Sequence, residues 1–212
     1  NTSDIIFICV GTPNRNNSNS ANLKYVFDVA NQLKKIIFNY KIIITKSTVP
    51  VSTGDKIEKI LKNLKNKKLV DVVSNPEFLR EGEAIRDFVY PDRVIVGTES
   101  KKADKILRTL YKPIVKKNSQ YFNTSRRGAE LIKYASNSFL ATKISFINEM
   151  ANLCEKTGVD IKDVSLGMGS DQRIGDKFLR AGPAYGGSCF PKDTRALIDI
   201  ANKFRTNMSI VK

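Results

Sequence analysis

Short apolar runs alternate with amphipathic stretches along the first half of this chain. The runs are rich in Ile and Val and stop at Gly, Pro or Asn, a pattern that is typical of strands. We expect strands at residues 5–10, 41–46, 69–73 and 93–97. Between these runs, apolar residues recur every three or four positions, which predicts helices. We expect these helices at residues 23–38, 53–64 and 101–111.

Strands that alternate with helices predict an α/β fold with a mainly parallel sheet and right-handed crossovers. The run at 5–10 is apolar throughout, as in a strand that is buried on both faces. Ligands bind such sheets beyond the carboxyl ends of the strands. Three motifs directly follow predicted strands: Gly11-Thr12-Pro13, Ser47-Thr48-Val49-Pro50 and Asn75-Pro76-Glu77-Phe78. Their shared position predicts a binding site at that edge.

The second half of the chain predicts helices only. A long helix is expected from Arg127 to Lys156, and Gly158 is suited to end it. The residues that recur at helical spacing along it are Leu131, Ala135, Ser138 or Phe139, Thr142, Phe146, Met150 and Leu153. A short helix at 161–167 and a glycine-rich loop at 170–189 follow. A last helix is expected from Thr194 to Phe204.

The segment Gly186-Gly187-Ser188-Cys189-Phe190-Pro191-Lys192-Asp193 carries the strongest chemical signal. It places a thiol in a glycine-rich loop two residues before a proline, and proline is a common first residue of a helix. The helix dipole and the charge of Lys192 both favour the reactive thiolate of a cysteine. The alternative is a buried structural cysteine, the usual fate of a free thiol.

The remaining composition limits the chemistry. Cys9, in a predicted strand, and Cys154, in a predicted helix, are expected to be structural thiols. Three scattered cysteines indicate neither a disulfide framework nor a metal site, so we expect a reducing, cytoplasmic setting. No apolar run approaches the ~20 residues of a membrane span. The chain does not begin with Met, and we expect that the start of a larger protein is missing.

Charge and the absence of histidine narrow the classes of function. Without histidine, any general acid or base must be Asp, Glu, Lys, Tyr or Cys. The net charge of +15 suits an anionic partner, such as nucleic acid, a membrane or a phosphate-bearing small molecule. No basic stripe is interleaved with stacking aromatics, so binding of nucleic acid is not favoured. A solvated basic surface explains much of this charge equally well.

Three pairs of polar residues stand at spacings that suit catalysis. Asn75 can cap a helix that starts at Pro76, which would place Glu77 and Glu81 on one face as a possible general base. Lys133 and Asn137 share one face of the long helix, and apolar neighbours suggest that Lys133 is partly buried and binds an anion or alkoxide. Asp193, four residues after Cys189, could hold a water against a thioester. Ordinary helix-start acids and an exposed lysine are the alternatives.

Five ordered motifs together resemble one family. They are Cys9–Pro13, Lys46–Pro50, Ser74–Gly82, Ala129–Asn137 and Gly186–Asp193, and they resemble the UDP-glucose/GDP-mannose dehydrogenase family. The resemblance implies a Rossmann-like NAD-binding domain, a central all-α domain with one long helix, and a C-terminal nucleotide-sugar domain. This chain would hold the later part of the first domain, at 1–124, and the central domain, at 125–212. The Gly-x-Gly-x-x-Gly turn that normally opens a dinucleotide-binding domain does not occur.

The resemblance also implies a reaction. UDP-glucose would lose four electrons to two NAD⁺ and become UDP-glucuronate. Cys189 would be the nucleophile that forms a thiohemiacetal and then a thioester. Lys133 and Asn137 would stabilise oxyanions, with Lys133 as a possible base and Asp193 supporting it. Glu77 would assist hydrolysis of the thioester, while Thr48 and Asp193 would hold the water.

The resemblance assigns binding residues as well. Those at the NAD site would be Val10, Gly11, Thr12, Pro13, Ser47, Thr48, Val49 and Glu81. Those at the substrate would be Glu77, Phe78, Leu79, Arg80, Glu81, Lys133, Asn137, Arg173, Phe178, Leu179, Arg180, Tyr185 and Gly186. Arg173 would be donated across the interface of a homodimer formed through the long helix.

Three other interpretations stay open at this point. GDP-mannose or another nucleotide sugar could be the substrate, although Asp171–Gly175 and Pro91-Asp92-Arg93 resemble the UDP-glucose branch more closely. The chain could also be an inactive remnant, and we expect no turnover from these 212 residues alone. A basic protein that binds nucleic acid is the third, and salt-sensitive binding to DNA or RNA would identify it.

Overall fold

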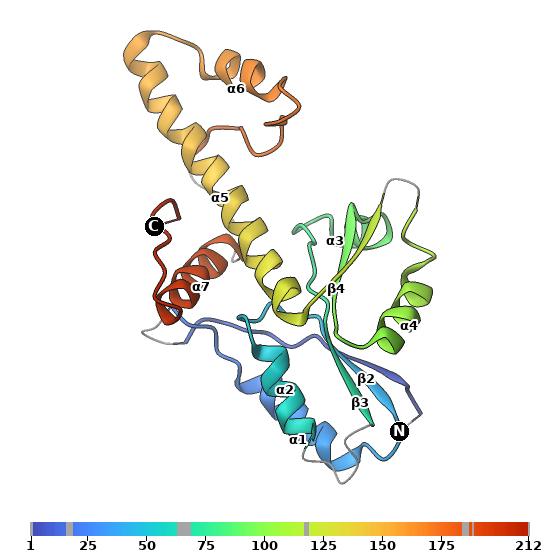
Figure 1. Ribbon diagram of the computed structural model, residues 1–212. Coiled ribbons are helices and arrows are strands. Elements are labelled where there is room, and N and C mark those ends of the chain that lie inside the picture. Colours follow the sequence, from blue (N-terminus) through green and yellow to red (C-terminus); the bar gives the residue numbers. More distant parts are fainter. Residues whose placement is uncertain are drawn as a thin grey trace. The chain divides into compact units, whose positions relative to one another are not determined.

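The computed structural model describes residues 2–15, 19–62, 69–116, 119–183, 187 and 189–211 (Figure 1). Two compact units divide the chain, Asn1–Lys133 and Tyr134–Lys212. The first unit is an α/β sheet with its helices, and the second is helical.

The first unit is built on a five-stranded sheet in the order β1-β2-β3-β4-β5. The strands are β1 (Ile5–Ile8), β2 (Lys41–Thr45), β3 (Val70–Ser74), β4 (Arg93–Gly97) and β5 (Gln120–Thr124). β1, β2 and β3 pair in parallel, as do β4 and β5. β3 and β4 run antiparallel and pair through Ser74 and Gly97. The predicted mainly parallel α/β sheet is therefore confirmed.

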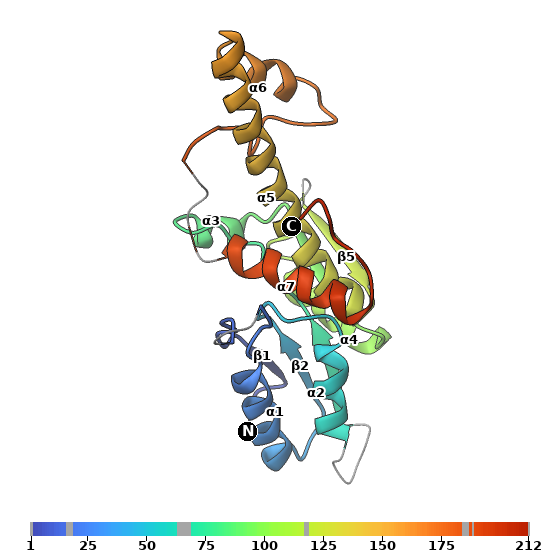
Figure 2. The same cartoon turned by 90° about the vertical axis from the view of Figure 1, so that its left-hand side faces the viewer.

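Helices cover both faces of this sheet. α1 (Lys24–Ile36) and α2 (Thr53–Lys62) lie side by side along one face, as Figure 2 shows, and pack on Ile43 of β2. α4 (Lys101–Tyr111) packs on the other face against Ile42 and Ile44. Because successive side chains of a strand point to opposite faces, the run Ile42-Ile43-Ile44 supplies both hydrophobic layers. This double burial explains why β2 is apolar along its whole length.

Three parts of the sheet unit differ from the sequence-based expectation. β1 ends at Ile8 and lies at the edge of the described sheet, where Ile6 and Ile8 pack on the side of α1 and α2 while Phe7, on the other face, is 40% exposed. Cys9 therefore lies beyond the strand and is exposed, which makes the prediction of a structural thiol wrong there. β5 was not predicted, because its sequence Gln-Tyr-Phe-Asn-Thr is mostly exposed and polar. α3 (Ala84–Val89) begins eight residues after Pro76, so the predicted helix at Pro76 is wrong.

The second unit begins within the long helix α5 (Arg126–Thr157), whose first residues, up to Lys133, belong to the first unit. Gly158 ends α5 in the left-handed conformation, with φ of +72°, and the amide of Val159 donates to the carbonyl of Cys154. Gly158 therefore ends the helix, as the sequence predicted. α6 (Ile161–Gly169) and α7 (Cys189–Lys203) complete the unit. No helix in the described ranges is long and apolar enough to span a membrane.

α5 buries a different face from the apolar row seen in the sequence. Along the second unit, Tyr134, Ser138, Ala141, Ile147 and Cys154 are buried. The burial of Cys154 agrees with a structural thiol. By contrast, large members of the apolar row are exposed, namely Phe139, Phe146 and Leu153. α5 therefore carries two apolar faces, and one of them has no partner within the described residues.

Gly97 allows β4 and α5 to approach closely. A Cβ atom at position 97 would lie 2.6 Å from Ala129 Cβ and 2.7 Å from the carbonyl oxygen of Ser125. We expect Gly97→Ala to lower the free energy of unfolding by about 1–3 kcal/mol, because backbone would have to shift. Urea unfolding followed by circular dichroism measures this change.

Gly167→Ala is the matched control for this prediction. Gly167 lies inside α6, and no atom lies within 4 Å of its added Cβ. We expect this control to leave stability unchanged or to raise it by up to about 1 kcal/mol, since Ala is the better helix former. Equal stability of the two variants would contradict the proposed close approach at Gly97.

Candidate active site

Three candidate loops leave the same edge of the sheet in the first unit. Val10–Pro13 follows β1, Ser47–Pro50 follows β2, and Asn75–Arg80 follows β3. These strands are parallel neighbours, so their carboxyl ends are adjacent. The predicted gathering of the three motifs at one sheet edge is thus confirmed. The loops occupy the position where open α/β sheets bind ligands.

Hydrogen bonds join the first two loops. The hydroxyl of Thr12 donates to the carbonyl of Thr48 at 2.8 Å, and the hydroxyl of Ser47 donates to the carbonyl of Val10 at 2.6 Å. Gly11 beside them is exposed, and no atom lies within 4 Å of a Cβ added there. The loop pair is therefore fixed in position, and Gly11 is open to solvent.

Asn75 anchors the third loop rather than capping a helix. Its side chain is fully buried, and its amide nitrogen donates to the carbonyl of Ile95 at 2.7 Å. Its carbonyl oxygen accepts from Lys46 Nζ at 3.1 Å and from the hydroxyl of Tyr111. These long-range partners use the groups that a helix cap would need, so Pro76–Arg80 stays irregular. Glu77 and Glu81 consequently do not share a helix face.

Glu77 and Lys133 form an ion pair at this edge. Lys133 Nζ lies 3.0 Å from Glu77 Oε1, and the Lys133 side chain is only 4% exposed. Glu77 Oε2 accepts from the amide of Leu79 at 2.7 Å, and the ring of Phe78 lies 5.2 Å from Lys133 Nζ. Lys133 is more deeply buried than its sequence surroundings predicted. The pair holds a positive charge and a carboxylate together at low solvent exposure, which suits stabilisation of an oxyanion.

Lys46 adds a second cation near this pair. Burial lowers the pKa of Lys46 to about 8, and the carboxylate of Glu77 opposes that shift. Lys46 Nζ also lies 5.8 Å from the centroid of the Tyr111 ring. Sequence reasoning gave Lys46 no role, although it stands directly before Ser47-Thr48 in a quoted motif. An ammonium with a lowered pKa can exchange protons near neutral pH.

Glu130 is a buried carboxylate that the sequence analysis also left without a role. It lies on α5, is 2% exposed, and accepts three hydrogen bonds, from Ser52, Gly54 and Ser74. Burial raises the pKa of Glu130 to about 7, while the amides of Gly54 and Ser52 oppose the rise. The only sequence signal for Glu130 is its place in the motif Ala129–Asn137, three residues before Lys133.

The remaining candidates in the loop after β3 are more open. Arg80 forms a bidentate pair with Asp87, with Nη2 and Oδ1 2.6 Å apart, and this arginine holds the pKa of Asp87 at about 2. The Phe78 ring stacks on the guanidinium of Arg93 at 4.3 Å. Leu79 and Glu81 are exposed. These side chains are accessible to a ligand without rearrangement of the core.

In the second unit, Cys189 is the first residue of α7. The predicted helix start at Pro191 or later is wrong, because α7 already includes Cys189, Phe190 and Pro191. Proline fits in this first turn, where the backbone N–H groups have no intrahelical partner. Cys189 is half-buried, and Asp193 follows it by about one helical turn. Tyr185, Gly186 and Ser188 lie outside the described residues.

Asp193 is the most enclosed acid of the second unit. Its side chain is 1% exposed, and its Oδ2 accepts from Asn137 Nδ2 at 2.6 Å. Its Oδ1 accepts from Lys192 Nζ at 2.6 Å. Two candidate residues from distant segments, Asn137 and Asp193, are thus in direct contact. Asp193 fixes the Asn137 amide, so that the amide oxygen is oriented by the same bond.

The loop before α7 is held by α5 and α6. Lys143 Nζ donates to the carbonyl of Ile174 at 3.0 Å, and the amide of Gly182 donates to Asn148 Oδ1 at 2.9 Å. Leu179 is buried, and its carbonyl accepts from the hydroxyl of Ser165 at 2.6 Å. Sequence reasoning missed the anchors Lys143 and Asn148, which stand on α5 outside the quoted motifs.

Other members of this loop are exposed or contact α7. The Arg173 side chain is largely exposed and pairs with Asp171, with Nη2 and Oδ2 2.6 Å apart. Phe178 adopts a left-handed φ of +66° and packs edge-on against the ring of Phe190 at 6.1 Å. Arg180 is exposed. The loop therefore combines a backbone held by hydrogen bonds with exposed cationic side chains, which suits binding of a diphosphate.

Comparisons with known proteins agree along the whole chain. The family model for the NAD binding domain of the UDP-glucose/GDP-mannose dehydrogenase family matches residues 1–115, and the model for its central domain matches residues 127–212. A UDP-glucose 6-dehydrogenase of Rhizobium meliloti is 49% identical over 99% of this chain and 48% of that protein. One of Bacillus subtilis is 49% identical over 99% of this chain and 47% of that protein.

Solved structures extend this likeness to three dimensions. A UDP-glucose dehydrogenase from Pyrobaculum islandicum has a TM-score of 0.92 at 39% identity, covering 99% of this chain and 48% of that one. A GDP-mannose dehydrogenase from Pseudomonas aeruginosa has a TM-score of 0.74 at 30% identity, covering 99% and 49%. The chain spans about half the length of the curated relatives it matches. The chain belongs to the UDP-glucose/GDP-mannose dehydrogenase family, whose NAD-binding and central domains it contains.

Proposed function

We propose that the protein to which this chain belongs oxidises UDP-glucose to UDP-glucuronate with NAD⁺, in two oxidation steps. The observation that carries the proposal is the buried Lys133–Glu77 pair at the carboxyl edge of the NAD-binding sheet. A cation with 4% exposure has a large effect on a developing alkoxide, because little water screens it. The substrate follows from relatives that are 49% identical over the aligned residues and whose names specify UDP-glucose.

In this proposal Cys189 carries the sugar between the two oxidations. NAD, when bound, supplies the hydride acceptor. The thiolate of Cys189 adds to the C6 aldehyde and forms a thiohemiacetal, and after the second oxidation the sugar is held as a thioester. Water then attacks the thioester carbonyl, the C–S bond breaks, and the carboxylate and the free thiol result. Thioester chemistry explains why the site needs a cysteine and no histidine.

The other residues hold charges and water in this proposal. Lys133 and Asn137 stabilise the oxyanions, and Lys133 can take up the alcohol proton. Glu77 assists hydrolysis, and Thr48 and Asp193 hold the attacking water. The buried contacts of Asp193 with Asn137 and Lys192 support this assignment, because they fix its carboxylate in one orientation. We assign Val10–Pro13, Ser47–Val49 and Glu81 to the border of the NAD site.

The remaining assignments concern the substrate. We propose that Phe78, Leu79, Arg80, Phe178, Leu179 and Arg180 contact it together with Tyr185 and Gly186, and that Arg173 reaches it from a second subunit. The free state of all three cysteines supports a reducing, cytoplasmic location. The domain division at residue 124 also remains a proposal, which limited proteolysis would test.

Steady-state assays of the full-length enzyme test the function. We expect UDP-glucose to yield two NADH for each UDP-glucuronate, with GDP-mannose giving no comparable rate. Turnover of GDP-mannose alone would replace the proposed substrate, and one NADH per sugar would contradict the thioester route. We expect no turnover from residues 1–212 by themselves, because the phosphate-binding glycine turn does not occur in them.

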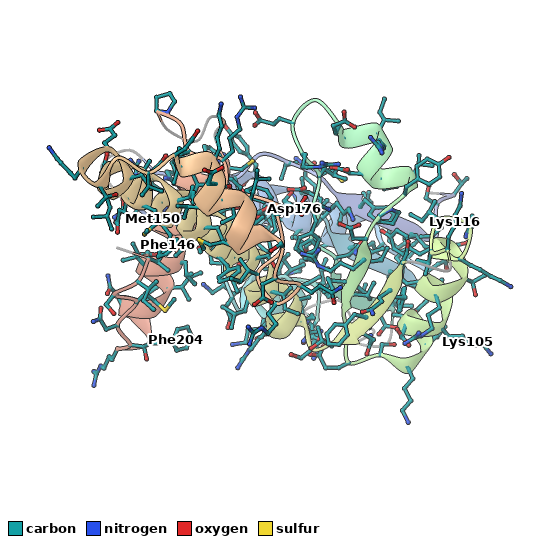
Figure 3. The ribbon with its side chains drawn as sticks, turned by 90° about the horizontal axis from the view of Figure 1, so that it is seen from above. Lys105, Lys116, Phe146, Met150, Asp176 and Phe204 are labelled. Atoms are coloured by element: carbon teal, nitrogen blue, oxygen red, sulfur yellow. The ribbon has the colours of Figure 1, made fainter. Side chains whose placement is uncertain are left out.

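We also propose a homodimer that forms through the exposed apolar row of α5. Phe139 is 66% exposed, Phe146 47% and Leu153 53%, and they recur at seven-residue intervals along the helix. Phe146 and Met150 lie next to each other on α5 in Figure 3. Such a row buries apolar area efficiently against a second copy of itself, since a two-fold axis pairs identical surfaces.

Phe146→Glu is expected to convert the full-length dimer to monomer, with at least about a tenfold rise in the dimer dissociation constant, because a carboxylate would be buried in the apolar contact. Analytical ultracentrifugation measures the constant. Ile210→Glu, at another exposed apolar residue, is the control and should leave it unchanged. An unaltered dimer in Phe146→Glu would rule out this face as the interface.

A further inference from the structure

Glu130 connects α5 to the segment that follows the Thr48 loop. Its Oε2 accepts from the backbone amide of Ser52 at 2.7 Å, and its Oε1 accepts from the amide of Gly54 at 2.7 Å. Ser52 belongs to the turn that leads from Pro50 into α2, and Gly54 is the second residue of α2. A carboxylate that accepts two backbone amides at the start of a helix fixes the direction of the incoming chain.

The same carboxylate reaches the end of β3. The hydroxyl of Ser74 donates to Glu130 Oε1 at 3.1 Å, and Ser74 is the last residue of that strand. The packing around this contact is tight, since a Cβ at Gly54 would lie 3.0 Å from Ser74 Oγ and 3.1 Å from Glu130 Oε1. Glu130 thus has three fixed partners on two other elements, at 2% exposure. Such a group tolerates little displacement.

The Thr48 loop is held from its other side by different bonds. Thr12 donates to the carbonyl of Thr48, and Ser47 donates to the carbonyl of Val10. Those bonds tie the loop to the segment that follows β1 and do not reach α5. Glu130 links the next segment to α5, which also carries Lys133, and Arg126 of α5 adds ion pairs with Asp55 and Glu58 of α2. The backbone at Ser52 has a left-handed φ of +74°, a conformation that a non-glycine residue keeps only when its surroundings enforce it.

We propose that Glu130 is a positioning residue, which sets the place of the Thr48 hydroxyl by holding the Ser52–Gly54 turn on α5. This inference rests on the proposed function, in which Thr48 holds the water that attacks the thioester. Glu130 itself touches neither substrate nor cofactor in this assignment. Its loss would therefore lower kcat and leave the KM for UDP-glucose nearly unchanged.

Two variants of the full-length enzyme test the inference. Glu130→Gln keeps the size of the side chain and removes one acceptor oxygen, and Glu130→Asp keeps the charge and shortens the reach. We expect either variant to lower kcat by about 10- to 100-fold, the effect of a displacement of about 1 Å, with KM changed less than about threefold. Glu149→Gln, at an exposed acid of α5, is the matched control and should behave as the native enzyme.

A double-mutant cycle with Thr48→Val separates positioning from a general loss of structure. If Glu130 acts through Thr48, Glu130→Gln lowers kcat by less than about threefold in the Thr48→Val background, because the placed group is already absent. An equal loss of kcat in both backgrounds would overturn the inference, and so would an unchanged kcat in the native background. Where Glu130→Gln does not fold, the same cycle with Glu130→Asp decides.

Hydrogen exchange gives a readout that needs no substrate. We expect the amides of Ser52 and Gly54 to exchange at least about tenfold faster in Glu130→Gln, with the exchange of α4 unchanged. Unchanged exchange at Ser52 and Gly54 would overturn the inference. If the native enzyme fails to oxidise UDP-glucose, the proposed function fails while this measurement still decides whether Glu130 holds the turn.

Discussion

A full-length enzyme that carries Cys189→Ser is expected to form UDP-glucuronate at least about 1000-fold more slowly than the native enzyme. A serine hydroxyl is a far weaker nucleophile than a thiolate near neutral pH, and no histidine exists in this chain to activate it. The hydroxyl would also form an ester in place of a thioester, which water attacks more slowly. Cys189 opens α7 and is half-buried, so a substitution of one atom should leave the fold intact.

Rapid-quench measurement of UDP-glucuronate, with NADH absorbance recorded in parallel, checks this expectation. Cys9→Ser is the matched control, because Cys9 is also a free thiol but lies on an exposed surface beyond β1. We expect this control to retain the native rate. A Cys189→Ser enzyme that releases the acid at the native rate would remove Cys189 from the chemistry, whatever the family resemblance implies.

The sheet could be predicted from the sequence wherever a strand is buried by neighbours on both faces. β2 appears in the sequence as an apolar run because α4 covers one of its faces and α1 and α2 cover the other. β5 escaped prediction because hydrogen bonds to β4 define it, while its side chains are mostly exposed. An edge strand of this kind has no apolar sequence pattern, because backbone hydrogen bonds and not buried side chains hold it to the sheet.

The loop after β3 and the start of α7 show the limit of local rules. Asn75-Pro76 is a common helix start in sequence, yet the buried partners of Asn75 come from Lys46, Ile95 and Tyr111, far away along the chain. Rules for local helix capping do not include hydrogen bonds from residues that are distant in the sequence. At α7, the helix begins two residues before Pro191, because the first turn needs no intrahelical amide bonds.

The residues of the candidate site could be predicted from the sequence, but the contacts between them could not. The sequence placed Lys133, Asn137, Glu77 and Asp193 in functional motifs, and the structure pairs Lys133 with Glu77 and Asn137 with Asp193. Glu130 and Lys46 also stand in quoted motifs, Ala129–Asn137 and Lys46–Pro50, but the sequence indicated no role for them. Their burial and their partners depend on which loops meet at the sheet edge, which spacing along the chain does not reveal.

Lys133→Met in the full-length enzyme is expected to lower kcat/KM for UDP-glucose by about 100- to 1000-fold, the effect of removing one preorganised stabiliser of an oxyanion. Methionine is unbranched and favours helices, so α5 should persist, and thermal unfolding checks that it does. The Glu77 carboxylate would lose its partner at 3.0 Å but would keep the amide of Leu79.

The burial of Lys133 is what makes this expectation large. An ammonium on an exposed face interacts weakly with a ligand because water screens it, so Lys156→Met, at the exposed end of α5, should change kcat/KM less than about twofold. Stopped-flow recording of the first NADH formed separates an effect on the first oxidation from one on hydrolysis. If Lys133 stabilises the alkoxide, the first oxidation slows. If only hydrolysis slows, Lys133 acts on the thioester through Glu77, and the proposed role of Lys133 in the first oxidation is wrong.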